Sequence, residues 1–287
     1  MEPSADRGEK TGARGLATVI AFVAVTQLVA IAITSTDATT VMNYGLQLGN
    51  FGISFLGPAL HPIVLLLVAS LVSLILARLV RARRKSSPVL IILFPLSVTV
   101  FSLTTLTLSI LVGGVLARQQ AFMVELGISA AIVLLLADVM YGGRTRFLAP
   151  VLMLLVSAEL ASYFALTIPL EEMILLILAF AAYDVYTVTR GPVKQVNKAS
   201  AGKPLPMIST SLGGVTLGLG DTIFYSMLPA AVSIAFERTS LLGSAIAIDI
   251  GLILTIVLLR RRTLLPGLPI PMALGLLVLF LLEVSGF

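Results

Sequence analysis

Long apolar runs separated by short polar connections dominate this chain of 287 residues. A helix needs about 20 mostly apolar residues to cross the hydrocarbon core of a bilayer. Nine segments of suitable length and character follow one another, at residues 15–35, 60–80, 88–116, 121–140, 147–168, 171–188, 212–236, 240–259 and 266–284. The pattern therefore predicts an all-α polytopic membrane protein with nine transmembrane helices.

The basic residues lie between alternate pairs of these runs. If the chain crosses the membrane nine times, 17 of its 19 Lys and Arg residues fall on the side of the N-terminus, and only Arg118 and Arg238 fall on the other. Basic residues accumulate in cytoplasmic connections of membrane proteins. We therefore expect a cytoplasmic N-terminus and an outside C-terminus.

The connections divide the chain into four parts. Residues 1–14 form a cytoplasmic tail, and residues 15–188 form a six-helix N-terminal membrane portion. A cytoplasmic loop rich in Gly, Pro, Ser and Lys follows at 189–211, and such a composition is typical of flexible connections. Residues 212–287 form a three-helix C-terminal membrane portion.

Composition narrows the chemistry. Hydrophobic residues make up 58% of the chain and charged residues 11%, against about a quarter charged in soluble domains. With no cysteine and a single histidine, His61, the chain lacks the residues for a disulfide, a thiolate nucleophile, or a cysteine- or histidine-rich metal site. We expect neither metal nor cofactor. The basic residues indicate topology, so no nucleic-acid partner is expected.

Five acidic residues lie inside the predicted spans, where acids are rare and are functional candidates. They are Asp138, Glu159, Asp184, Asp221 and Asp249. Asp138 lies close to a cytoplasmic end, which favours an interfacial or paired carboxylate. Glu159 and Asp249 lie nearer mid-span, and for both we favour a structural role, either protonated or hydrogen-bonded to Ser or Thr of a neighbouring helix.

Asp184 and Asp221 are related by topology. Asp184 lies six residues before Arg190, about 9 Å inside the cytoplasmic end, and Asp221 lies about 15 Å inside it if the segment after Ser211 is helical. Consecutive antiparallel spans usually pack together, so the two carboxylates can face each other. Two close carboxylates do not both ionise readily and hold one proton between them. Such a pair suits general acid–base hydrolysis or, alternatively, a proton- or cation-coupled transporter or channel.

Glycine and proline weaken the helices around this pair. Gly218 and Gly220 make the backbone just before Asp221 poor at forming helix, although Gly214 and Gly218 also have the spacing of a helix-packing pair. The stretch "LPGLPIPM", residues 265–272, contains three prolines, which block regular helix hydrogen bonding. We predict an extended opening to the last span, with a proline-rich helix start as the alternative.

Three short motifs, in order on the sixth, seventh and ninth spans, resemble those of presenilin-type intramembrane aspartyl proteases. The YD, GxGD and PAL motifs of this family correspond to Tyr183-Asp184, Gly218-Leu219-Gly220-Asp221 and Pro266-Gly267-Leu268, with Gly267 in place of the family's alanine. The stretch "GLGDTIFYS" is similar to the presenilin "GLGDFIFYS". An inside N-terminus resembles the presenilin branch, because signal peptide peptidases share the motifs in the reverse orientation.

The resemblance implies an aspartic endopeptidase that hydrolyses peptide bonds within transmembrane segments of membrane proteins. Asp184 and Asp221 would then be the catalytic dyad, and Tyr183 would help to shape the site. The glycine motif and residues 266–268 would help to position substrate. Substrate transmembrane helices and the lipid bilayer would be the partners of a multi-pass protein, in the cell membrane if the chain is prokaryotic.

Overall fold

The computed structural model describes most of the predicted helices but not the whole chain. It describes residues 13–44, 100, 104, 118–140, 147–189, 209–212, 215–236, 238–259 and 266–285. The predicted span at 60–80 lies outside the described residues, as do His61, nearly all of 88–116 and most of the loop at 189–211.

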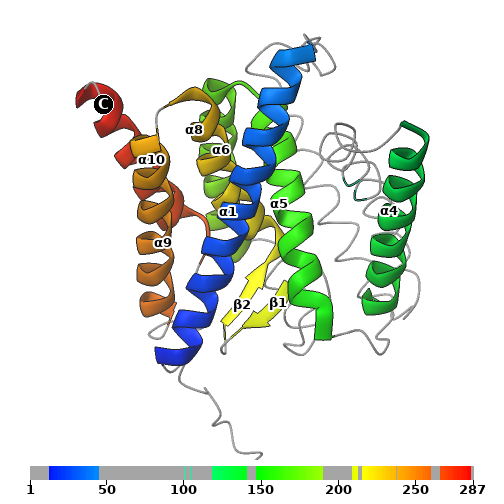
Figure 1. Ribbon diagram of the computed structural model, residues 1–287. Coiled ribbons are helices and arrows are strands. Elements are labelled where there is room, and N and C mark those ends of the chain that lie inside the picture. The colour runs from blue at the N-terminus through cyan, green and yellow to red at the C-terminus, as the bar shows by residue number, and fades with distance from the viewer. Residues whose placement is uncertain are drawn as a thin grey trace, which may run out of the picture.

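The described residues form seven α-helices and one β-hairpin (Figure 1). The helices are α1 (Ala13–Tyr44), α4 (Arg118–Met140), α5 (Ala149–Thr167), α6 (Leu170–Thr189), α8 (Leu219–Ala235), α9 (Arg238–Leu259) and α10 (Pro269–Ser285). Four of them contain a stretch long and apolar enough to cross a membrane. The helical membrane architecture predicted from the apolar runs is thus confirmed.

Helix boundaries agree with the sequence pattern within a few residues, with two exceptions. The break predicted between the fifth and sixth spans is present, because α5 ends at Thr167 and α6 begins at Leu170, just after Pro169. The first exception is α1, which continues to Tyr44 instead of ending at Ser35. Polar residues end the apolar run at Ser35 but do not break a helix, whereas Gly45 is a typical helix-terminating residue.

The second exception is the segment before α8, which we expected to be helical from Leu212. It forms instead an antiparallel hairpin of β1 (Ser209–Leu212) and β2 (Val215–Gly218), and α8 begins only at Leu219. Leu212 pairs with Val215, so residues 213–214 form a two-residue turn. Both are glycine, which suits the tight turns that join hairpin strands. The helical register assumed for the depth of Asp221 was therefore wrong.

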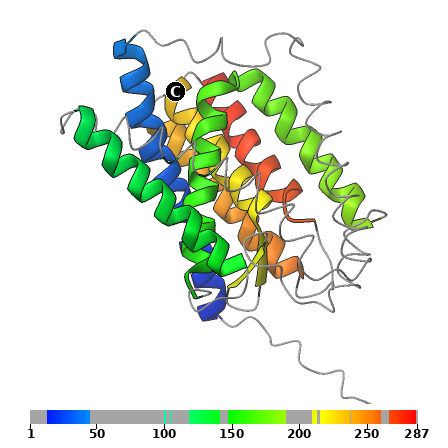
Figure 2. The same ribbon diagram turned by 90° about the vertical axis from the view of Figure 1, so that its right-hand side faces the viewer.

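Helix α8 lies at the centre of the bundle. It packs against α1, α5 and α9, and it also contacts α6 and α10 (Figures 1 and 2). One hydrophobic core joins residues of α1, α5 and α6 to residues of α8, α9 and α10. The two predicted membrane portions on either side of residues 189–211 therefore share a single core. Helix α4 packs on α5 through a second cluster.

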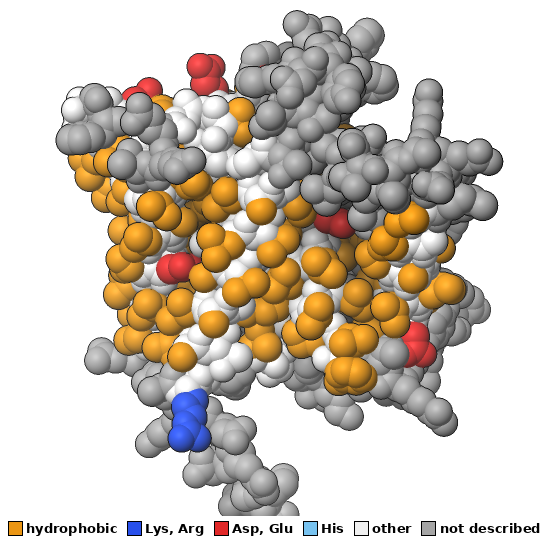
Figure 3. Space-filling view, in the orientation of Figure 1, with side chains coloured by type: hydrophobic (Ala, Val, Ile, Leu, Met, Phe, Trp, Pro, Cys, Tyr) orange, Lys and Arg blue, Asp and Glu red, His pale blue; other side chains and the backbone are white. Residues whose placement is uncertain are grey.

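The outward faces of the helices are apolar. Large hydrophobic side chains cover much of the described surface in Figure 3, including Leu28, Leu134, Leu178 and Phe280. A lipid environment accounts for this surface, since soluble monomers rarely expose apolar patches of such extent. Helices α8 and α10 have 17 residues each, about 26 Å, which is slightly less than the hydrocarbon thickness of about 30 Å. Each is preceded by extended backbone.

Candidate active site

Helix α6 carries Asp184 to the segment that opens α10. The backbone N–H of Leu268 donates a hydrogen bond to Asp184 Oδ2 at 3.1 Å, although the two residues are 84 positions apart. Helix α10 begins only at Pro269, so residues 266–268 precede the helix. The predicted extended opening of the last span is present, and Asp184 uses one of its free backbone groups.

Asp221 lies in the first turn of α8, three residues after the cap residue Gly218. Gly218 is extended, with φ −82° and ψ 147°, and its backbone N–H donates to the Asp221 carboxylate. An acidic side chain at this position often reaches back to the cap amide and also interacts favourably with the helix dipole. The glycine-rich backbone before Asp221 is therefore a strand joined to a helix start. Since Gly218 lies in β2, it is not part of a helical packing pair, and Gly214 lies outside the described residues.

Gly267 separates the two carboxylates by very little protein. A Cβ atom added to Gly267 would lie 3.2 Å from Asp221 Oδ2 and 3.3 Å from its Cγ, so the Asp221 carboxylate lies against the Gly267 backbone. The next residue, Leu268, donates to Asp184. The structure thus brings Asp184 and Asp221 together on one short segment, close enough to interact electrostatically.

Contacts between helices hold the two carboxylates in place. Ser157 Oγ of α5 and Thr222 Oγ1 of α8 form a buried hydrogen bond of 2.7 Å, next to Asp221 in the sequence. On the other side, the ring of Phe180 lies 4.8 Å from that of Phe224, which joins α6 to α8. Tyr183 packs edge-on against Phe180, at 6.4 Å between ring centroids. Tyr183 therefore supports the aromatic contact between the helices that carry the dyad.

Gly220 is the one motif glycine whose surroundings are open. A Cβ atom added there would have no described atom within 4 Å, whereas at Gly218 it would lie 3.1 Å from Asp221 Oδ2. Gly220 is also exposed, while its neighbour Leu219 packs against the core. The backbone beside Asp221 is therefore accessible on the side of Gly220.

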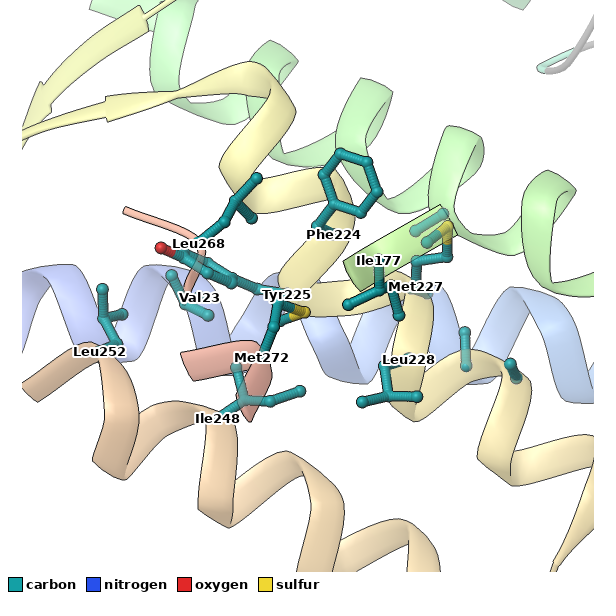
Figure 4. Packing of buried hydrophobic residues seen from close by; sticks show 14 of the residues in the cluster. Val23, Ile177, Phe224, Tyr225, Met227, Leu228, Ile248, Leu252, Leu268 and Met272 are labelled. Carbon is teal, nitrogen blue, oxygen red and sulfur yellow. The ribbon is translucent and has the colours of Figure 1, made fainter. Parts of the chain in front are cut away.

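Tyr225 was missed by the sequence reasoning. It lies on α8 one turn after Asp221, is 1% exposed, and its hydroxyl donates to the Gly267 carbonyl at 2.9 Å. Figure 4 shows it extending from α8 toward the coil that carries Leu268. Gln27 of α1 donates to the Tyr225 backbone carbonyl at 3.2 Å. The spacing of four residues from Asp221 was the available signal, but an aromatic residue in an apolar helix is more often simply core.

The other membrane acids lie elsewhere. Glu159 accepts hydrogen bonds from Thr104 Oγ1 at 2.9 and 3.1 Å, as expected for a carboxylate paired with a hydroxyl. Asp249 Oδ1 is buried without a partner among the described residues, so for this oxygen the expected hydrogen bond is not seen. Asp138 is half-buried near the end of α4. In the part of the chain that the structure describes, no three acidic or histidine side chains come together as metal ligands.

Sequence comparison finds presenilins. The Presenilin family model matches residues 187–285, which include Asp221 and residues 266–268 and begin three positions after Asp184. The presenilin homolog of Drosophila melanogaster is 46% identical over 68 residues, or 23% of this chain and 13% of that protein. Presenilin sel-12 of Caenorhabditis elegans is 46% identical over the same length, or 15% of that protein. The chain thus aligns with less than a sixth of the length of these curated relatives.

Structural comparison extends the likeness to almost the whole chain. A presenilin family intramembrane aspartate protease solved in space group C222 has a TM-score of 0.67 at 20% identity, covering 94% of this chain and 99% of that one. A structure in space group P2 has a TM-score of 0.64 at 19% identity, covering 93% and 96%. The resemblance to the presenilin family predicted from the motifs is confirmed, in fold over nearly the whole chain and in sequence over its C-terminal third.

Proposed function

We propose that the chain is an intramembrane aspartic endopeptidase in which Asp184 and Asp221 form the catalytic dyad. The observation that carries this proposal is that residues 267–268 touch both carboxylates, one from α6 and one from α8. The two acids come from distant parts of the sequence, and both motifs that accompany them meet at the same place. The transporter alternative gains no support from the relatives found.

The chemistry follows from one proton shared by two carboxylates. One carboxylate, ionised, accepts a proton from water as the water oxygen attacks the peptide carbonyl carbon. The other, protonated, donates its proton to the carbonyl oxygen. Collapse of the tetrahedral intermediate then breaks the C–N bond, and the amine leaves with a proton. The cycle uses only water and the two acids, and it needs neither a metal nor a covalent intermediate.

The hairpin offers a way to hold an extended substrate. Strand β1 contacts α1 and α5, while β2 runs directly into α8, whose third residue is Asp221. An extended peptide that added to the outer edge of β2 would gain main-chain hydrogen bonds and lie close to Asp221. Gly220 leaves open space beside that path. A substrate transmembrane helix would need to unwind locally in order to bind in this way.

The finer topology is part of the proposal. Nine spans with a cytoplasmic N-terminus fit the distribution of basic residues. An odd number of spans requires the two ends of the chain on opposite sides, and in Figure 1 α1 begins at the end of the bundle opposite to the C-terminus. Residues 1–14 and 189–211 would then be cytoplasmic. The protein would lie in the cell membrane if the source is prokaryotic, with lipid and substrate transmembrane segments as its partners.

Reconstitution with a single-span substrate tests the dyad. We expect Asp184→Asn and Asp221→Asn each to abolish cleavage while leaving the helical content unchanged, because the amide neither accepts nor supplies the proton. Asp249→Asn is the matched control, since it removes a membrane carboxylate outside the site, and it should cleave normally. Cleavage at the wild-type rate by either site variant would refute the assignment.

A further inference from the structure

The peptide unit between Gly267 and Leu268 is held at both of its polar atoms. Its carbonyl oxygen accepts from the Tyr225 hydroxyl at 2.9 Å, and its N–H donates to Asp184 Oδ2 at 3.1 Å. A peptide unit is planar, so its C=O and N–H cannot turn independently. Fixing the carbonyl on α8 therefore fixes the direction in which the amide points toward α6.

Prolines explain why the Gly267 carbonyl needs an outside donor. In a regular helix this carbonyl would accept from the N–H four residues later, which is position 271, but Pro271 has no N–H. The first helical bond of α10 runs instead from the Met272 N–H to the Leu268 carbonyl, at 3.1 Å. A buried carbonyl without a partner is costly. Tyr225 supplies the donor that the helix lacks.

We propose that Tyr225 is a positioning residue, whose hydroxyl holds the 267–268 peptide unit so that its amide stays on Asp184 and Gly267 stays against Asp221. This inference rests on the proposed protease function for its kinetic consequence. The hydroxyl acts through the peptide unit, while the aromatic ring fills the core between α1, α8 and α9 (Figure 4). Removing the hydroxyl alone therefore separates positioning from packing.

Tyr225→Phe is the test, and Tyr163→Phe is its matched control. Tyr163 lies on α5 with 40% of its surface exposed, so its variant also removes one phenol hydroxyl, but from the outer face of the bundle. For Tyr225→Phe we expect kcat to fall about 10- to 100-fold, because a displaced segment loses one hydrogen bond and the alignment of the dyad. We expect KM to change by less than about threefold, and Tyr163→Phe to match the wild type.

Hydrogen exchange gives a readout that does not depend on activity. The peptide covering residues 264–272 contains three prolines, so it has few exchanging amides and the Leu268 N–H is one of them. Tyr225→Phe should expose about one further amide of this peptide to rapid exchange, because an N–H released from a hydrogen bond exchanges faster. Tyr163→Phe should leave the uptake of this peptide unchanged.

Each other outcome overturns the inference. Wild-type kcat and exchange in Tyr225→Phe would show that the hydroxyl holds nothing. A lower kcat without faster exchange at 264–272 would place its effect outside this peptide unit, and equal losses in both variants would reduce it to general stability. An inactive wild type in which Tyr225→Phe still accelerates exchange at 264–272 would refute the proposed protease function and leave the positioning role intact.

Discussion

Replacement of Gly251 tests whether the position of α10 controls the site. Gly251 lies on α9, where the backbone of α10 approaches it directly. A Cβ atom added at Gly251 would lie 2.4 Å from Pro271 Cα, 2.9 Å from Pro271 N and 3.1 Å from the Ile270 carbonyl oxygen. All three atoms belong to the backbone, so no side-chain rotation relieves the overlap. Gly251→Ala must separate the two helices by about 1 Å to reach ordinary contact near 3.4 Å.

The expected sign is opposite to that of an ordinary helix substitution. In a free helix, Gly→Ala stabilises by about 0.5–1 kcal/mol. Forcing an extra methyl group into a packed interior costs about 1–3 kcal/mol, so the net effect at Gly251 is a loss of about 1–2 kcal/mol. The displaced Pro271 is only three residues after Leu268, and an error of about 1 Å at the site can reduce kcat about 100-fold.

The assay combines thermal unfolding, followed by circular dichroism, with cleavage of a reconstituted single-span substrate. Gly127→Ala on α4 is the control, because a Cβ atom there would meet no described atom within 4 Å. This control should be as stable as the wild type or slightly more stable, with unchanged kcat. The reasoning would be refuted if Gly251→Ala unfolded at or above the wild-type temperature and cleaved at the wild-type rate.

Three further predictions concern the dyad and its surroundings. Gly220→Ala should fold normally, because its surroundings are open, yet raise KM severalfold if substrate occupies that space; an unchanged KM would place the substrate elsewhere. Gly267→Ala should remain active with kcat reduced less than about tenfold, because Asp221 must shift only a few tenths of an ångström; complete inactivity would show that the segment cannot adjust. Activity should fall on both sides of a pH optimum, since acid protonates the base and alkali removes the donated proton. A flat profile from the folded enzyme would contradict proton sharing.

The sequence was sufficient for the parts of the site that depend on chain order. Apolar runs located the helices, and their alternation placed Asp184 and Asp221 on antiparallel neighbours. The prolines of residues 265–272 predicted that α10 would begin late, and it begins at Pro269. These features follow from local properties such as hydrophobicity, charge and missing amides, which act over a few residues.

The hairpin was missed because an apolar average conceals a turn. Residues 212–236 are apolar enough to read as one span, yet Gly213–Gly214 between β-branched residues is a known hairpin signal. Strong hydrophobicity outweighed this local signal in the prediction. The Tyr225–Gly267 and Thr104–Glu159 contacts could not be predicted, because each joins residues more than 40 positions apart through one hydroxyl. Only the packed helices determine which acceptor such a hydroxyl reaches.

A broken helix start also explains how two acids on separate helices are kept at a fixed separation. Non-helical backbone among apolar helices persists only where protein or water satisfies its polar groups. At the start of α10, a side chain of α8 satisfies the Gly267 carbonyl and a side chain of α6 satisfies the Leu268 amide. One peptide unit thus ties α6, α8 and α10 together by directional bonds, where apolar packing alone would allow the helices to slide. A regular helix at this point would engage its own polar groups and have none to offer the dyad.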